Sequence, residues 1–476
     1  MGLQQLPHAH PAGTLLSSLT SLAMAAPTYT LTPIKSSWKG AVREPPGQRN
    51  RSEKLYISVR SSVGVAVRSY VRSLWEGLLP GAAAIGRHGE ATGLTSKQRL
   101  HAALDGRPLD RLPVAVLYYP LYQQDHFAEL AGRPAWELHA WLHAPPEEHT
   151  RTYLEMAAQT PFDMLEPQCA PPREERERAE FFLQGGRPYR RDRVTGHLTP
   201  LSPTVSGHAR DYHANEEQIV FDPADAEAQV LIEKADRMIA RGDNDYLDAL
   251  IAAAGAAHFI LSGGVIGTLY SCTRYLGMTN LFELLAAQPD LVDYLSSRIL
   301  ESNIEHIRRF AAAGGDAIFI DDATATSDMI SVAHYERFSL PYMTEMVREI
   351  HRLGHKAIVI YFGGIADRLD QIASIGADAL SMETSMKGYV NDIADIAARI
   401  GDRVTLIGNI DPVGVVERGG DGDLEADIAR QVAAGRRARG FIISTGSPIT
   451  PGTPLSRVRR FIELARKHGT EGIADG

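Results

Sequence analysis

The sequence predicts a (β/α)8 barrel, and three observations support this fold class. Eight short apolar runs recur between residues 112 and 446, and each is followed by a polar or glycine-rich loop. Helix-length segments separate most of the runs, as expected where strands and helices alternate. The runs are largely apolar rather than apolar at every second position, which is typical of parallel strands buried on both faces. The active site of such a barrel lies at the carboxyl ends of its strands.

The folded core is expected to begin just before the first run. Thr95 or Ser96 caps a short helix there, and Pro113 leads into the first strand. Residues 179–205 contain glycine turns and alternate in polarity, which predicts an inserted β-hairpin or meander. The eight predicted strands are 112–120, 161–168, 258–264, 316–322, 356–364, 378–385, 403–411 and 440–446.

Residues 1–92 differ in composition from the remainder of the chain. They contain ten Lys and Arg residues against four Glu, and they are rich in Ser, Pro and Gly. An Arg-rich, acid-poor composition is typical of a transit peptide. It also fits a disordered extension, or sequence translated from an upstream start codon, and we favour these two readings. We therefore expect a disordered or loosely docked extension over 1–92 and a single barrel domain over 93–476.

Composition narrows the functional class. The 476 residues are 44% hydrophobic and 22% charged, which is sufficient for a large buried core. The net charge of −9 and the absence of a long basic run argue against a nucleic-acid partner. Two cysteines suit a reducing cytosol, so we expect a cytoplasmic protein. No apolar run reaches the roughly 18 residues of a membrane span.

Three stretches of the core carry a family resemblance. They are the opening SKQRLHAALDGRPLDRLPV (96–114), the strand and loop LIGNIDP (406–412), and the closing ISTGSPITPGTPLSRVRRFIELAR (443–466). Together they resemble the uroporphyrinogen decarboxylase superfamily over about residues 95–468. That superfamily also contains corrinoid-dependent methyltransferases. The resemblance implies the barrel fold and favours a homodimer.

The loop after the first predicted strand departs from the decarboxylase pattern. Uroporphyrinogen decarboxylases carry an RQAGRY-type loop, whose guanidinium groups meet the carboxylates of the porphyrinogen. Here the loop reads YYPLYQQDHFAEL (118–130), and its first arginine is Arg133. The departure disfavours decarboxylation of a porphyrinogen.

A second departure concerns zinc. The thiol-methylating members of the superfamily bind zinc through a His-x-Cys-Gly motif and a later Gly-Cys, which turns the thiol into a thiolate. The corresponding stretches here are Ile360-Tyr361-Phe362-Gly363 and Gly446-Ser447, so no zinc is expected. METSMKGYVNDI (382–393), which follows YFGG, is similar to a zinc-free subgroup that moves a methyl group between a corrinoid and tetrahydrofolate.

Such a reaction requires an anchored pterin and a polar group that follows the changing charge of folate N5. A carboxylate suits the amidine-like pterin edge, and an asparagine can both donate and accept at N5. The candidates lie at or near the predicted strand ends. The expected catalytic residues are Asn409, Asp322 and Glu383, and the expected binding residues are Tyr119, Glu166, Gln168, Tyr270, Asp321, Tyr361, Lys387 and Asp411.

Each group of candidates also has a structural interpretation. Asp321 and Asp322 are adjacent residues that can cap the next helix, although burial would instead make Asp322 a general acid. Glu383 and Lys387 have the i,i+4 spacing of a surface helix pair. Residues 409 and 411 can form a turn at the barrel rim.

The resemblance thus implies a methyltransferase that moves a methyl group between a corrinoid and tetrahydrofolate in a demethylation pathway. No cobalamin-binding loop is apparent, so the corrinoid is expected as methylcobalamin from solution or on a separate corrinoid protein. Three alternatives stay open. They are a corrinoid-dependent demethylase of a methylated substrate such as a methoxyaromatic, a decarboxylase of a small acid, and a non-catalytic barrel subunit.

Overall fold

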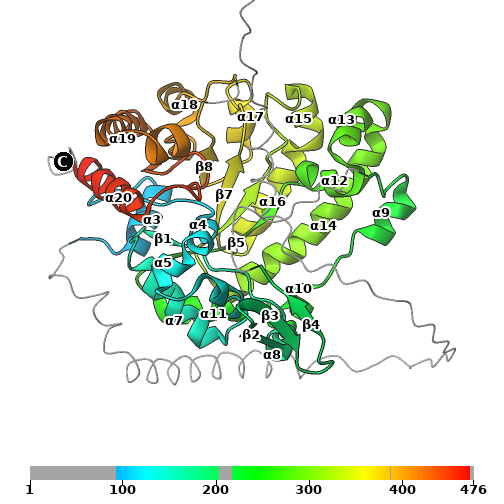
Figure 1. The fold of residues 1–476 in the computed structure, drawn as a ribbon. Coiled ribbons are helices and arrows are strands. Elements are labelled where there is room, and N and C mark those ends of the chain that lie inside the picture. The colour runs from blue at the N-terminus through cyan, green and yellow to red at the C-terminus, as the bar shows by residue number, and fades with distance from the viewer. Residues whose placement is uncertain (1–92, 203–216, 386–387, 472–476) are drawn as a thin grey trace, which may run out of the picture. The chain divides into compact units, whose positions relative to one another are not determined.

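The computed structural model describes residues 93–202, 217–385 and 388–471. The predicted extension over 1–92 and the candidate Lys387 therefore lie outside the described residues. The core is a curled parallel sheet surrounded by helices (Figure 1). Seven parallel strands pair in the order β1-β5-β6-β7-β8-β9-β10. Their bounds are β1 Met164–Leu165, β5 Phe259–Ile266, β6 Ala317–Asp321, β7 Lys356–Tyr361, β8 Ala379–Met382, β9 Thr405–Ile407 and β10 Phe441–Ile442.

Helices connect these strands and cover the outer face of the sheet (Figure 1). Before β5 they are α3 Ser96–Leu104, α4 Tyr119–Asp125, α5 Phe127–Ala131, η3 Ala135–Glu137, α6 Leu138–Trp141, α7 Pro146–Ala157, α8 Arg173–Arg178, α9 Pro223–Gln229, α10 Ala235–Arg241 and α11 Asp245–Ala254. After β5 they are α12 Thr268–Leu276, α13 Met278–Ala287, α14 Pro289–Ala313, α15 Val332–Phe338, α16 Leu340–Arg352, α17 Leu369–Ser374, α18 Ile393–Ile400, η4 Pro412–Glu417, α19 Asp421–Gly435 and α20 Leu455–Thr470. Within the described ranges, no helix has both the length and the apolar character needed to cross a membrane.

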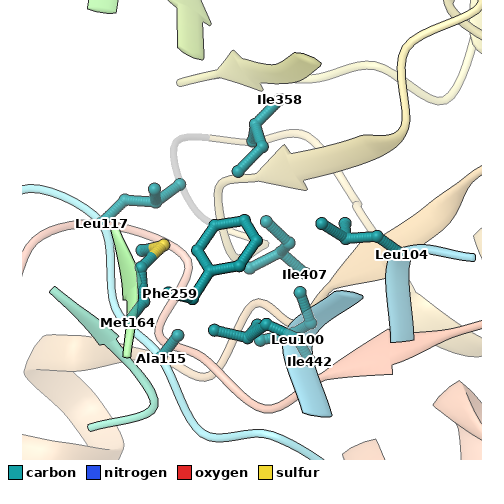
Figure 2. Close-up of a pocket in the computed structure, with 9 residues that line it drawn as sticks. All are labelled: Leu100, Leu104, Ala115, Leu117, Met164, Phe259, Ile358, Ile407 and Ile442. Atoms are coloured by element: carbon teal, nitrogen blue, oxygen red, sulfur yellow. The ribbon is translucent and has the colours of Figure 1, made fainter. Parts of the chain in front are cut away.

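Each strand is apolar on both faces because its side chains alternate between two cores. In β6, Ile318 and Ile320 pack toward the helices, whereas Ala317 and Phe319 belong to the core inside the barrel. Figure 2 shows part of this inner core, where Leu100 and Leu104 of α3 lie with Phe259 in an apolar pocket. The interior is therefore filled by side chains, as is usual for an eight-fold barrel.

The strand predicted over 112–120 is wrong. Only Val114 pairs, through an isolated parallel bridge to Ile443. Its carbonyl oxygen also accepts the Asp163 N–H at 2.8 Å, so this segment closes the barrel between β10 and β1. Farther on, Tyr118 turns into the left-handed region (φ 60°) and Pro120 starts helix α4, so the chain leaves the sheet.

Two further predictions are confirmed, namely the cap of the first helix and the inserted β-meander. Thr95 caps α3 in a capping box with Gln98. The insertion is a three-stranded antiparallel meander of β2 Ala179–Gln184, β3 Arg187–Asp192 and β4 Leu198–Pro200. Gly185 and Gly186 have φ of 60° and 77°, which is the backbone that a tight hairpin turn between β2 and β3 requires.

The amino-terminal end of the barrel carries a repeat that the sequence pattern did not reveal. Asp163, Asp316 and Asp378 each immediately precede a strand, and each carboxylate accepts a backbone N–H of the neighbouring segment of the sheet. The three donors are Val114 at 2.8 Å, Ile260 at 2.8 Å and Ala357 at 2.9 Å. Each carboxylate also binds two basic side chains, namely Arg99 and Arg111, Lys97 and His101, and Lys356 and His351, respectively. The repeat therefore ties successive strands together at the end opposite the predicted site.

Candidate functional site

The carboxyl ends of the strands surround a small hollow inside the barrel. We call it the mouth pocket. It is lined by Leu117, Tyr118, Phe362, Ser381, Thr445, Gly446, Ser447 and Pro448. These residues come from the segment before α4 and from the ends of β7, β8 and β10, where a barrel of this type places its chemistry.

Tyr118 connects two buried carboxyl groups beside this pocket. Its hydroxyl donates to Asp321 Oδ2 at 2.5 Å, and its backbone N–H donates to Glu166 Oε2 at 2.8 Å. Its ring packs edge-on against Phe319, with ring centres 5.2 Å apart. Gly264 makes room for Phe319, because a Cβ at this position would lie 2.2 Å from the Phe319 ring. Tyr118 therefore hydrogen-bonds to both Asp321 and Glu166.

Both acids are poised to exchange protons near neutral pH. Burial raises the pKa of Asp321 to about 7; the Tyr118 hydrogen bond opposes this shift and the Asp322 charge adds to it. Burial likewise raises the pKa of Glu166 to about 8, against the backbone N–H groups of Tyr118 and Tyr119. Asp321 Oδ1 is buried and has no hydrogen-bond partner within the described part of the chain. Asp321 therefore offers a free oxygen that can gain or lose a proton at pH 7.

Asp322 points to the other face of β6. It is fully buried and accepts the Ser339 hydroxyl at 2.7 Å and the Tyr270 N–H in the first turn of α12. Burial raises its pKa to about 6, against these hydrogen bonds. The structure thus places Asp322 between the sheet and the helices, where it caps α12 as a helix N-terminus favours.

Glu383 faces the inside of the barrel immediately after β8. Its side chain is almost fully buried, Ser447 Oγ lies 3.3 Å from Oε1, and the Tyr389 hydroxyl donates to Oε2. Residues 383–385 are not helical, so a surface helix pair with Lys387 does not describe Glu383. Ser447 lines the mouth pocket, so Glu383 lies directly behind one polar side chain of the pocket wall.

Asn409 joins the loops behind Glu383. Its amide nitrogen donates to the Asn391 carbonyl at 2.8 Å and to the Glu383 carbonyl at 3.4 Å, and its oxygen accepts from Gln431 Nε2 at 2.8 Å. Asp411 caps η4 by accepting two backbone N–H groups at 2.9 Å each. The structure therefore gives both residues hydrogen bonds that shape the rim, as the turn interpretation expected.

The remaining candidates lie around the pocket rather than in it. The Tyr119 hydroxyl donates to Thr160 and the Tyr361 hydroxyl meets Tyr335, and all four belong to contacts on the helix side of the sheet. Gln168 donates to the Pro120 carbonyl at 3.2 Å and so fixes the start of α4. Tyr270 lies on α12, close enough to Tyr118 to help raise the pKa of that phenol, although burial is the main cause.

The sequence indicated no role in the folate reaction for three residues beside the site: Tyr118, Tyr389 and Ser447. Tyr118 stands at a predicted strand end, but its role depends on a left-handed backbone that the apolar pattern does not reveal. Ser447 appeared only as a replacement for a zinc ligand. No group of three or more His, Cys, Asp or Glu side chains that could hold a metal ion occurs in 93–202, 217–385 or 388–471. The absence of zinc stays a prediction.

Replacing Asn409 by alanine is expected to lower the free energy of unfolding by about 2–3 kcal/mol, because buried partners lose their hydrogen bonds. Urea unfolding of Asn409→Ala, Gln431→Ala and the double variant measures this. The losses should be less than additive, since both variants break the same bond. Unchanged stability in Asn409→Ala would show that these bonds do not support the rim.

The fold and site together define a parallel α/β barrel with buried acids at its mouth. Residues 245–468 match the family model "Uroporphyrinogen decarboxylase (URO-D)". The resemblance of this chain to the uroporphyrinogen decarboxylase superfamily is thereby confirmed over these residues.

Curated relatives are uroporphyrinogen decarboxylases. The protein of Tolumonas auensis is 29% identical over 188 residues, covering 39% of this chain and 50% of its own length. The chloroplastic protein of Nicotiana tabacum is 27% identical over 303 residues, covering 60% and 73%. The chain spans about half the length of the first of these relatives. These relatives are enzymes, and they leave the reaction of this chain open.

Among solved structures, a methyltransferase from Methanosarcina mazei superposes with a TM-score of 0.57 at 19% identity. The match covers 79% of this chain and 99% of that protein. At this identity the likeness concerns the fold. It agrees with the α/β barrel described above.

Proposed function

We propose that this protein is a methyltransferase that moves a methyl group between a corrinoid and tetrahydrofolate. The observation that carries the proposal is the buried Asp321 carboxyl, which has a pKa of about 7 and one oxygen without a hydrogen-bond partner among the described residues. When folate accepts the methyl group, the N5–carbon bond forms and the cobalt–carbon bond breaks with its electron pair left on cobalt. N5 then loses a proton, which the Asp321 carboxylate takes up, and the reverse reaction returns it.

The charge of the site supports this substrate class. Glu166, Asp321 and Glu383 are the acids beside the mouth pocket, and no Lys or Arg stands among the described residues that line it. A polycarboxylate would find acidic side chains and no guanidinium group there. A pterin instead presents N–H donors, which a carboxylate oxygen accepts. The acidic surroundings of the mouth pocket therefore favour folate over a porphyrinogen as the substrate.

The corrinoid enters this proposal as a substrate, supplied in the cytoplasm by a partner corrinoid protein or from solution. Leu117, Phe362 and Pro448 give the mouth pocket an apolar surface beside the acids. Such a surface keeps water away from a transferring methyl group. A homodimer remains part of the proposal.

One second function has a specific observation in its favour. Glu166, with a pKa of about 8, is protonated at neutral pH and is suited to protonate the carbanion left by a decarboxylation. The curated relatives are decarboxylases, which fits the same reading. The substrate would be a small acid, since a porphyrinogen finds no cation at the mouth pocket.

Mixing the protein with methylcobalamin and tetrahydrofolate tests the proposal. Loss of the methylcobalamin spectrum should be matched one for one by methyltetrahydrofolate, detected by mass spectrometry. The same protein is assayed with a methylated corrinoid protein as donor and with methyltetrahydrofolate in the reverse direction. No transfer in any of these arms would refute the proposal. Release of carbon dioxide from a small acid would favour the decarboxylase instead.

A further inference from the structure

We infer that Tyr118 is a positioning residue, which holds Asp321 with one carboxyl oxygen bound and the other free for the substrate. The inference rests on the proposed function for the identity of that substrate. It assigns a role to a residue that touches the reacting acid on one side and a second acid on the other. The supporting observations are the contacts of the Tyr118 hydroxyl, ring and backbone.

The hydroxyl determines which oxygen is free. It donates to Asp321 Oδ2 at 2.5 Å, while Oδ1 is buried without a partner among the described residues. A carboxylate held by one short hydrogen bond cannot exchange its two oxygens without breaking that bond. The free oxygen is therefore kept in one place before the substrate arrives, as preorganised catalysis requires.

The ring of Tyr118 is itself immobilised. It lies edge-on to Phe319 with centres 5.2 Å apart, and tilted against Phe362 with centres 5.8 Å apart. Both phenylalanines belong to the inner core, and Phe362 also lines the mouth pocket. Packing of the ring therefore fixes the position of the Tyr118 hydroxyl.

The backbone conformation of Tyr118 explains why its side chain points into the barrel. Among the described residues it is the one non-glycine residue with positive φ, at φ 60° and ψ 25°. This left-handed conformation is strained for an L-residue. Glu166 supports it by accepting the Tyr118 N–H at 2.8 Å. A glycine would avoid the strain, but it would supply neither the ring nor the hydroxyl.

Other ionisable groups act on the same pair. Asp322 lies on the opposite face of β6, and its charge raises the Asp321 pKa, although burial contributes more. The charges of Glu166 and Tyr270 add to the raised pKa of the Tyr118 hydroxyl. Removing the Tyr118 hydroxyl leaves Asp322, Glu166 and Tyr270 in place. The response of Asp321 to that change therefore reports on the single hydrogen bond.

Tyr118→Phe tests the inference, because it keeps the ring and deletes the hydroxyl. Titration of the Asp321 carboxyl is followed by infrared difference spectroscopy, with Asp321→Asn as the reference that lacks this group. The midpoint should rise by about one pH unit, since a hydrogen bond that favours the ionised form is lost. The acid limb of the methyl-transfer rate should move by the same amount, and kcat should fall more than KM rises.

Tyr246→Phe is the matched control. Tyr246 is also a buried tyrosine, and its hydroxyl bonds to the carbonyls of Leu142 and Ala144 in the helix layer. It should lose stability without moving the Asp321 midpoint. Phe362→Leu keeps the Tyr118 hydroxyl but loosens the packing of its ring. It should move the Asp321 midpoint in the same direction by a smaller amount. This variant replaces Tyr118→Phe if that protein does not fold.

An unchanged Asp321 midpoint in a folded Tyr118→Phe protein would overturn the inference. The infrared titration needs no substrate. If the wild-type protein transferred no methyl group, the proposed function would fail while the positioning of Asp321 was still measured. The two failures are therefore distinguishable.

Discussion

Asp321→Asn is expected to lower the rate of methyl transfer by about 10²–10⁴-fold, the usual range for losing a proton-transferring group. The free energy of unfolding at pH 7 should stay the same or rise, because asparagine still accepts the Tyr118 hydroxyl and removes a buried ionisable group. Single-turnover kinetics and urea unfolding of the same preparations measure the two quantities.

The rate of the wild-type protein should also depend on pH in a defined direction. Toward folate, Asp321 must be ionised to take up the N5 proton, so the rate should rise as pH increases through about 7.

Asp392→Asn is the matched control for Asp321→Asn. Asp392 caps α18, where its carboxylate accepts the backbone N–H groups of Ala394 and Asp395 and lies 3.9 Å from the Arg430 guanidinium. Equal losses in both variants would contradict a specific role for Asp321.

Asp163→Ala is expected to have the largest effect on stability, about 3–5 kcal/mol, because it takes away the buried carboxylate that Arg99 and Arg111 share. Arg99 then keeps only its ion pair with Asp110. The Asp163 carboxylate is fully buried and binds Arg99 at 2.8 Å and Arg111 at 2.8 Å. It also accepts the Val114 N–H that closes the barrel. Urea unfolding at pH 7 measures the loss, and Asp392→Ala should cost only the amount typical of a helix cap, about 1 kcal/mol. A loss no larger than that of the cap variant would show that the network is not a main support of the fold.

The same network predicts acid sensitivity. Burial alone would raise the pKa of Asp163, but hydrogen bonds from Arg111 and the charges of both arginines lower it below the ordinary value. A lowered folded-state pKa stabilises the native state above the unfolded-state pKa, and this contribution is lost as pH falls through the folded value. The pKa values of Asp316 and Asp378 are lowered in the same way, by basic neighbours that outweigh burial. Stability should therefore fall below about pH 4 in wild type, and by less in Asp163→Ala.

The fold class could be predicted from the sequence because the buried strands of a parallel barrel always appear as short apolar runs. It placed strands within residues 161–168 and in the six later runs, where the structure has them. It failed over 112–120, since hydrophobicity does not reveal that Tyr118 adopts a left-handed backbone or that Pro120 begins a helix. The division at residue 92 stays a prediction.

The site was predicted only in part, for a related reason. Where both faces of a strand are apolar, the pattern does not tell which residue faces inward, and a shift of one position reverses the assignment. Asp321 and Asp322 illustrate this, since one faces Tyr118 inside the barrel and the other caps α12. The same uncertainty affected Tyr361, whose hydroxyl meets Tyr335, while its neighbour Phe362 lines the mouth pocket.

Calorimetric titration with tetrahydrofolate, comparing wild type with Asp321→Asn, tests most directly whether Asp321 belongs to a folate site. We expect wild type to bind and the variant to bind at least about tenfold more weakly, the effect of one hydrogen bond to a charged group. Binding that is absent in wild type, or equal in the two proteins, would contradict the assignment of Asp321 to a pterin.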